Sequence, residues 1–190
     1  MENLEKLAYE WATIEPEKAD IKSEFYCQTR DVFQARLEKM TREMIAEGKI
    51  EEDEIYIISA IAGEIGNNSF DHNVGSWPDV PGVFFGYNLS EEKNKIILVD
   101  RGRGILKTLK KVKPDIADDK EALEIAFTQK ISGRAPENRG NGLKFVKSNI
   151  KEKKLRLLFV SGNALAEVNE KMEIKDSNQK INGCLAILSF

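Results

Sequence analysis

Hydrophobic and polar positions follow two different periods along the chain. In the first part apolar residues recur at the spacing of an amphipathic helix, whereas in the later part short apolar runs are separated by polar turns, as in strands. The predicted helices cover about 23–47, 51–74, 105–112, 119–129 and 143–153. The predicted strands cover 83–89, 95–100, 155–160, 165–168, 172–174 and 184–190.

The order of these elements predicts an α+β fold, a two-layer α/β sandwich with helices on one face of a mixed, mainly antiparallel sheet. Consecutive strands are joined by short turns rather than helices, which disfavours a doubly wound parallel sheet. Residues 1–50 are interpreted as an N-terminal helical extension and residues 51–190 as the main domain. Gly48 is the expected stop of the helix at 23–47.

Composition narrows the class of protein. The 190 residues are 41% hydrophobic and 32% charged, which is typical of a globular chain with a substantial core. The net charge of −3 gives no reason to expect nucleic acid as a partner. We expect no signal peptide, no membrane span and a cytoplasmic location, because no long apolar run occurs. Cys27 and Cys184 have no metal-ligand spacing and are expected to be reduced core thiols.

A polar stripe interrupts the apolar face near the end of the second predicted helix. Glu64, Asn68 and His72 stand at i, i+4 and i+8, so a helix places them on one face, with Asp71 beside them. Burying such a stripe costs free energy unless it has partners. His72 is the only histidine in the sequence. The alternative to a place in a polar site is that its side chain is exposed to water at the helix end.

Two glycine-bearing stretches downstream indicate a nucleotide and its metal as those partners. Asp100 ends a buried strand, where its carboxylate could accept a hydrogen bond from an amino group such as that of adenine. Gly102 and Gly104 allow a tight turn and the close approach of a flat ring. The second stretch opens a helix, whose free N–H groups attract phosphate, and reads Gly140-Asn141-Gly142-Leu143. Taken alone, each stretch also fits an ordinary turn or a helix start without a ligand.

The combination is more specific than its parts. Glu-x-x-x-Asn on a helix, Asp-x-Gly-x-Gly after a strand, a long polar loop and Gly-x-Gly-Leu opening a helix, in that order, resemble the GHKL ATPase superfamily. This group includes histidine kinases, type II topoisomerase ATPase domains, mismatch-repair ATPases, heat-shock chaperones and anti-sigma-factor serine kinases. The resemblance covers roughly 51–190. It implies a histidine-kinase-like ATP-binding domain of the Bergerat-type fold, with ATP and Mg²⁺ as ligands.

The resemblance also implies residue roles. Asn68 matches the Mg²⁺ ligand, Glu64 the general base and Asp100 the residue that reads adenine. Asp71 and His72 match positions that often contact phosphate or sugar.

Further implied contacts lie around the base and in a loop over the nucleotide. Gly102 and Gly104 match the glycines under the base, and 105–139 matches a lid that excludes water. Cations in or beside this lid could neutralise phosphate charge, or could simply be solvated: Lys130, Arg134 and Arg139. The remaining implied ATP contacts are Ile105, Gly140, Asn141, Gly142 and Leu143.

The chain departs from the family pattern in two places. Gly183-Cys184 stands where a glycine-threonine pair often begins the last strand, so we expect that contact with the nucleotide to be weakened or lost. The helix at 23–47 carries no histidine, which excludes a complete self-phosphorylating histidine kinase.

Within the superfamily, the spacing of Glu64, Asn68 and His72 and the compact single-domain size most resemble the anti-sigma-factor serine kinases. This resemblance implies a stand-alone signalling kinase or ATPase that acts on a separate regulatory or substrate protein, with a homodimer left open. The alternative is a nucleotide-dependent protein-binding module with little or no turnover. A third interpretation keeps the fold and treats the motifs as vestigial.

Overall fold

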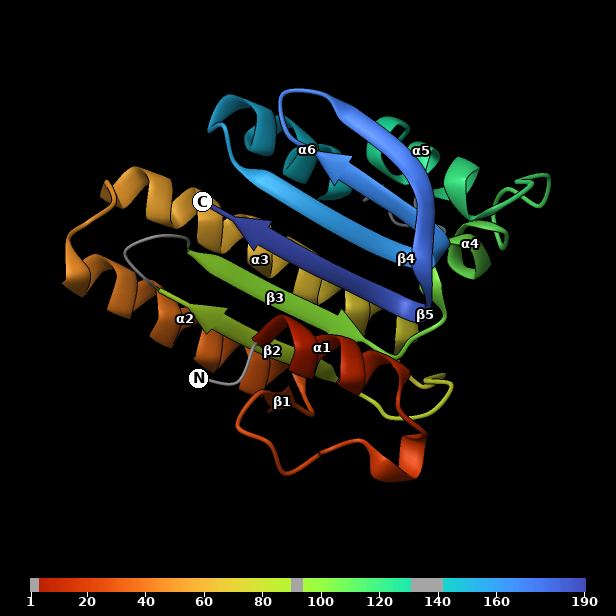
Figure 1. The fold of residues 1–190 in the computed structure, drawn as a ribbon, viewed down its shortest axis with the longest axis horizontal. Coiled ribbons are helices and arrows are strands. Elements are labelled where there is room, and N and C mark those ends of the chain that lie inside the picture. The colour runs from red at the N-terminus through yellow and green to blue at the C-terminus, as the bar shows by residue number, and fades with distance from the viewer. Residues whose placement is uncertain (1–3, 90–93, 131–141) are drawn as a thin grey trace.

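The computed structural model describes residues 4–89, 94–130 and 142–190. Its centre is a five-stranded sheet in the order β1-β2-β3-β5-β4, in which every neighbouring pair is antiparallel (Figure 1). The strands are β1 (Tyr26–Cys27), β2 (Val83–Asn88), β3 (Lys95–Asp100), β4 (Arg156–Val168) and β5 (Met172–Ser189). The helices are α1 (Leu4–Thr13), the short 3-10 helix η1 (Pro16–Lys18), α2 (Arg30–Glu47), α3 (Glu52–Asn73), α4 (Gly104–Leu109), α5 (Asp119–Thr128) and α6 (Gly142–Glu152). The predicted α+β class is confirmed, although these strands form a purely antiparallel sheet rather than a mixed one.

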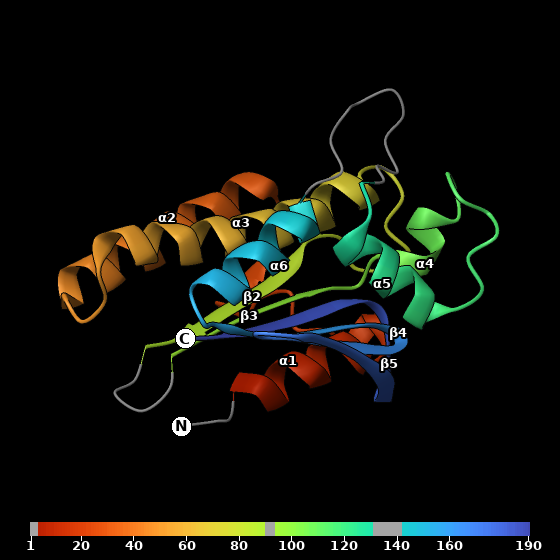
Figure 2. The same cartoon turned by 90° about the horizontal axis from the view of Figure 1, so that it is seen from above.

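Helices cover both faces of the sheet. Figure 2 shows α2, α3, α5 and α6 on one face and α1 on the other. Both faces of the central strand β3 are apolar and need cover. Ile96 and Leu98 pack into the cluster under α3. Ile97 and Val99, which point to the opposite face, pack into the cluster under α1. The prediction that helices lie on one face only is therefore wrong for α1, which adds a partial third layer.

The helix predicted over 23–47 begins later, at Arg30. Thr29 is its N-cap and accepts a hydrogen bond from the backbone N–H of Val32 at 3.3 Å. The residues just before the cap form β1, in which Tyr26 pairs with Phe84 at the edge of the sheet. The expected stop at Gly48 is confirmed, since this residue has the left-handed φ of 63°.

The elements of residues 1–50 pack against the rest of the chain. On α2, Leu37 and Met40 are buried in the same cluster as Ile58 of α3. The two helices are also joined by a 2.7 Å hydrogen bond between the hydroxyls of Thr41 and Ser59. No helix in the described ranges is long and apolar enough to cross a membrane.

Near the C-terminus, the structure has two long strands, β4 and β5, where four short strands are predicted at 155–160, 165–168, 172–174 and 184–190. The polar turn predicted between 155–160 and 165–168 is instead an irregularity inside β4, where Gly162 has a φ of 62°. The backbone N–H of Asn163 donates to Asp119 at the start of α5, at 2.9 Å. Likewise, 172–174 and 184–190 both belong to β5. Turn-forming residue types mark bulges as well as turns, so their presence alone did not separate the two outcomes.

Candidate functional site

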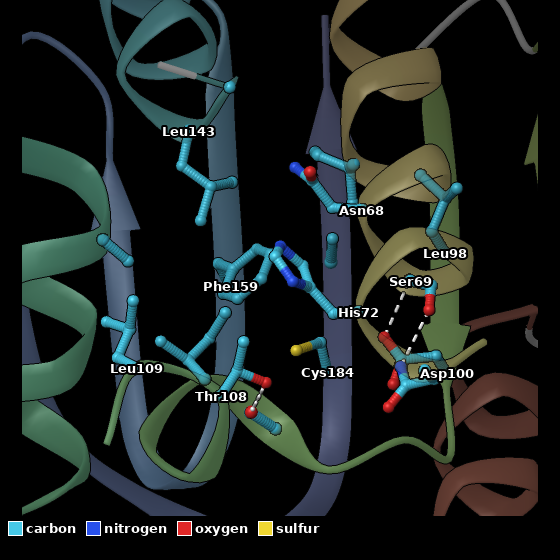
Figure 3. A pocket seen from close by; sticks show the side chains of 17 residues that line it. Asn68, Ser69, His72, Leu98, Asp100, Thr108, Leu109, Leu143, Phe159 and Cys184 are labelled. Carbon is cyan, nitrogen blue, oxygen red and sulfur yellow. Dashed lines mark hydrogen bonds between the residues drawn. The ribbon is translucent and has the colours of Figure 1, made fainter. Parts of the chain in front are cut away.

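A pocket lies between α3, α4, α6 and the strands β3, β4 and β5 (Figure 3). It contains about 860 Å³ of free space, part of it open to solvent. Leu98 and Phe159 are among its apolar walls. The predicted site residues in its lining are Asn68, His72, Asp100, Gly104, Ile105, Gly142 and Leu143. The fold therefore gathers all three sequence stretches, which are distant along the chain, around one pocket.

Asp100 is the charged residue at one end of this pocket, and it is only 3% exposed. Ser69 Oγ donates to its Oδ2 at 2.7 Å (Figure 3). The backbone N–H of Gly102 donates to its Oδ1 at 2.8 Å. Burial raises the pKa of Asp100, while these hydrogen bonds and those from Cys184 act in the opposite direction. Ser69 and Gly102 supply the two hydrogen bonds of normal length to this carboxylate in the described residues, and Cys184 interacts with it more weakly. A carboxylate has about four acceptor positions, so Asp100 can accept a further hydrogen bond from a donor in the pocket.

Two further polar side chains hold the loop that follows Asp100. Asn73 Oδ1 accepts from the backbone N–H of Arg103 at 3.0 Å. Ser161 Oγ accepts from the N–H of Ile105 at 3.0 Å and donates to the carbonyl of Gly183 at 2.9 Å. The loop therefore has its shape set by α3 on one side and by β4 and β5 on the other.

Glycines allow the close approaches at this end. Gly104 has a φ of 74°, in the left-handed region, and a Cβ there would lie 2.8 Å from the carbonyl oxygen of Asn182. A Cβ on Gly183 would lie 2.5 Å from Asp100 Oδ1 and 2.6 Å from the backbone nitrogen of Gly102. Gly102 itself is buried and packs on the amide of Asn73 rather than lining the pocket.

Cys184 keeps a place in the pocket lining despite replacing the expected threonine. Its Sγ lies 3.7 Å from Ser161 Oγ. Burial and then the neighbouring Asp100 raise the pKa of Cys184 well above its usual value. The side chain is thus a neutral thiol, which is a weak hydrogen-bond donor and a poor nucleophile.

His72 points into the pocket beside Phe159 (Figure 3). Burial, and to a smaller degree the charge of Lys111, lowers the pKa of His72. The ring is therefore neutral near pH 7, with one nitrogen as donor and the other as acceptor.

At the other end of the pocket, Glu64 and Asn68 meet the first residue of α6. A Cβ on Gly142 would collide with the Glu64 carboxylate and lie 3.1 Å from Asn68 Nδ2. Both side chains are half-buried, and neither has a hydrogen-bond partner within the described ranges. A carboxylate and an amide beside a helix N-terminus suit a phosphate-bound Mg²⁺, which prefers a few protein oxygens together with phosphate and water.

Not every predicted residue joins the pocket. Glu64 lies at its edge rather than in the lining. Asp71 points away and forms an ion pair with Arg30 of α2. Lys130 is exposed just after α5. The other predicted contacts lie outside the described residues: Arg134, Arg139, Gly140 and Asn141.

Sequence reasoning missed the small polar residues that support Asp100. Ser69 and Asn73 follow Asn68 and His72 by one position each on α3, so a wider view of the polar stripe could have included them. Ser161 lies in an apolar strand and had only its polarity as a signal. These three residues act through strand and helix packing that spacing alone does not reveal.

The comparisons with known proteins add no assignment. No protein-family model and no curated protein matches this chain. Within the described ranges, no group of three or more His, Cys, Asp or Glu side chains is arranged to hold a metal ion.

Proposed function

We propose that this protein binds ATP with Mg²⁺ in the pocket and is a cytoplasmic signalling kinase or ATPase that acts on a separate protein. The observation that carries the proposal is the buried Asp100, which retains acceptor capacity at one end of a pocket whose other end is the N-terminus of α6. The antiparallel sheet under α3 and α6, together with the motif order, supports a Bergerat-type fold of the GHKL superfamily.

Adenine suits the Asp100 end. Its exocyclic amine would donate to the carboxylate, and its flat ring would lie between apolar walls that include Leu98 and Phe159. The neutral His72 can donate one hydrogen bond to the sugar or to a phosphate.

The triphosphate suits the Gly142 end. There the N–H groups of α6 would bind phosphate oxygens, and Asn68 would offer its amide oxygen to the metal. A metal ion held there would supply positive charge that offsets the charge of the phosphates. Glu64 is the carboxylate available to take the proton of an attacking hydroxyl or water.

One observation favours the alternative of a binding module without turnover. Glu64 lies against Gly142 but is not among the residues that line the pocket, so it is less well placed than Asn68 to act on a bound nucleotide. Nucleotide binding would then act by favouring one partner-binding conformation over another.

Titration calorimetry with ATP and Mg²⁺ tests the binding proposal. We expect Asp100→Asn to weaken binding by about 10-fold to 100-fold, because a hydrogen bond to a charged group is lost. Asp176→Asn is the matched control, since this carboxylate is exposed on β5 and pairs only with Lys120 in the described part of the chain. Absence of ATP binding by the wild type would overturn the proposal.

Turnover separates the two candidate functions. Purified protein is incubated with ATP carrying a labelled γ-phosphate, with and without the proteins that it captures in ATP but not in ADP. Release of more than one labelled phosphate per chain, or labelling of a captured protein, supports the kinase or ATPase. Tight binding without either result supports the regulatory module.

A further inference from the structure

Arg101, the residue after Asp100, is buried on the opposite face of the sheet. It is 6% exposed, and its guanidinium lies 5.9 Å from the centre of the Trp11 ring of α1. Asp100, in contrast, bonds to Ser69 of α3 on the pocket face. Two consecutive residues at the end of β3 therefore contact helices in different layers.

The guanidinium has four hydrogen bonds to two separate segments. It donates to the carbonyls of Trp11 at 2.5 Å and Ile14 at 2.7 Å, at the C-terminal end of α1. It also binds both carboxylate oxygens of Asp79 at 3.0 Å. The last carbonyls of a helix lack partners within the helix and carry partial negative charge, so a buried cation suits this position.

This arrangement restrains the segment that presents Asp100. A planar guanidinium with a bidentate carboxylate and two fixed carbonyls has one preferred orientation. Because Arg101 is covalently joined to both Asp100 and Gly102, that orientation also limits how the carboxylate and the following turn can move. The Gly102 N–H that donates to Asp100 comes from the same segment.

We propose that Arg101 is a positioning residue for base recognition, and that it couples the docking of α1 on the far face of the sheet to the nucleotide pocket. This inference rests on the proposed function. In it, α1 is more than a cover for the apolar sheet face, since its C-terminal carbonyls help to hold Asp100 in the geometry that binds the base. By reciprocity, nucleotide binding also stabilises the docked α1.

The test compares ATP with inosine triphosphate, which carries a carbonyl oxygen in place of the adenine amine. We expect the wild type to prefer ATP by about 10-fold or more, because that oxygen cannot donate to Asp100. In Arg101→Met this preference should fall several-fold toward that of Asp100→Asn, and Arg101→Lys should restore part of it. Arg156→Met is the control, because Arg156 forms an exposed ion pair with Glu167 on β4 and should keep the wild-type preference.

The ratio of the two affinities isolates positioning from stability. Partial unfolding lowers the apparent affinity for both nucleotides by the same factor and leaves the ratio unchanged. If Arg101→Met does not fold, Asp79→Asn is the second variant, since it weakens the bidentate pair and leaves the two carbonyl contacts. A wild type that binds no ATP overturns the proposed function. If the wild type prefers ATP and Arg101→Met shows an equal preference, only the role of Arg101 is overturned. The same conclusion follows from an equal preference in Asp79→Asn, where that variant takes the place of Arg101→Met.

Hydrogen exchange tests the coupling to α1 directly. ATP with Mg²⁺ should slow amide exchange in residues 4–14 of the wild type, and it should slow that exchange less in the Arg101 variant that folds. Unchanged exchange in α1 of a wild type that binds ATP would contradict the coupling.

Discussion

At the Asp100 end of the pocket, a buried carboxylate is joined to Ser69, Gly102 and the loop after β3 by hydrogen bonds that need no ligand. At the Gly142 end, Glu64 and Asn68 are half-buried side chains without hydrogen-bond partners in the described residues. The Asp100 end, where we propose that the base binds, is therefore part of the folded core. At the Gly142 end, where we propose that the phosphates bind, Glu64 and Asn68 take no part in hydrogen bonds among the described residues.

This difference has a consequence for mutations. Under the proposed function, a change at the base end should alter both stability and recognition, because the same hydrogen bonds would serve both. A change at the phosphate end should alter chemistry or metal binding and leave the fold almost unaffected. The following substitutions test that contrast, from the largest expected effect to the smallest.

Glu64→Gln should have the largest effect, and only on turnover. If Glu64 is the general base, the rate of phosphate release falls by about 10²–10⁴-fold, while Tm and the affinity for ATP stay close to those of the wild type. Steady-state turnover and calorimetry measure the two properties. Glu124→Gln, at an exposed position of α5, is the control. Unchanged turnover in Glu64→Gln would remove Glu64 from the mechanism.

Gly183→Ala should be the most damaging change at the base end. Its Cβ would collide with the backbone oxygen of Asp100 and approach Gly102, and we expect a loss of about 3 kcal/mol in the free energy of unfolding together with weaker ATP binding. Gly48→Ala is the comparison, since nothing lies within 4 Å of its Cβ and only the φ of 63° opposes it. Urea unfolding measures both, and equal losses would show that the close approach at Gly183 has no cost of its own.

Ser69→Ala removes the hydroxyl that donates to Asp100. We expect a loss of about 2 kcal/mol in unfolding free energy, since a buried charged acceptor loses a donor. The pKa of Asp100 should rise further, because a hydrogen bond that lowers it is gone. Ser59→Ala serves as a control, because among residues 4–89, 94–130 and 142–190 its hydroxyl bonds only to the neutral hydroxyl of Thr41. A smaller loss in Ser69→Ala than in Ser59→Ala would contradict this view of the base end.

Substitution of His72 should have the smallest effect on stability, and this effect should depend on pH. The pKa of His72 is lowered in the folded state. Below about pH 6.5, which is the pKa of this residue in the unfolded chain, the unfolded chain binds the proton more readily than the folded chain. The free energy of unfolding therefore decreases as the pH falls. The slope from this residue is at most about 1.4 kcal/mol per pH unit. Unfolding free energies at pH 7.5 and 5.5 should therefore differ less in His72→Gln than in the wild type. An equal difference in the two proteins would show that the ring titrates alike in both states.

Several parts of the site could be predicted from local pattern. The helical period of α3 placed Asn68 and His72 on one face, and both line the pocket. The same period placed Asp71 beside them, but its direction was decided by Arg30, a cation on another helix that no spacing rule locates. The cover of β3 by α1 was missed for the same reason, because an apolar run signals burial without showing what covers each face.

The sequence by itself determined where most helices and strands lie, the stop at Gly48, the α+β class and the three stretches that meet in the pocket. These follow from the side-chain period, from helix capping and from the freedom of glycine, all of which act over a few residues. Only the tertiary structure decided that Ser69 donates to Asp100, that Gly183 leaves room for that carboxylate, and that Arg101 holds the end of α1. Such contacts join residues brought together by strand pairing and by packing on both faces of the sheet, and no local rule specifies them.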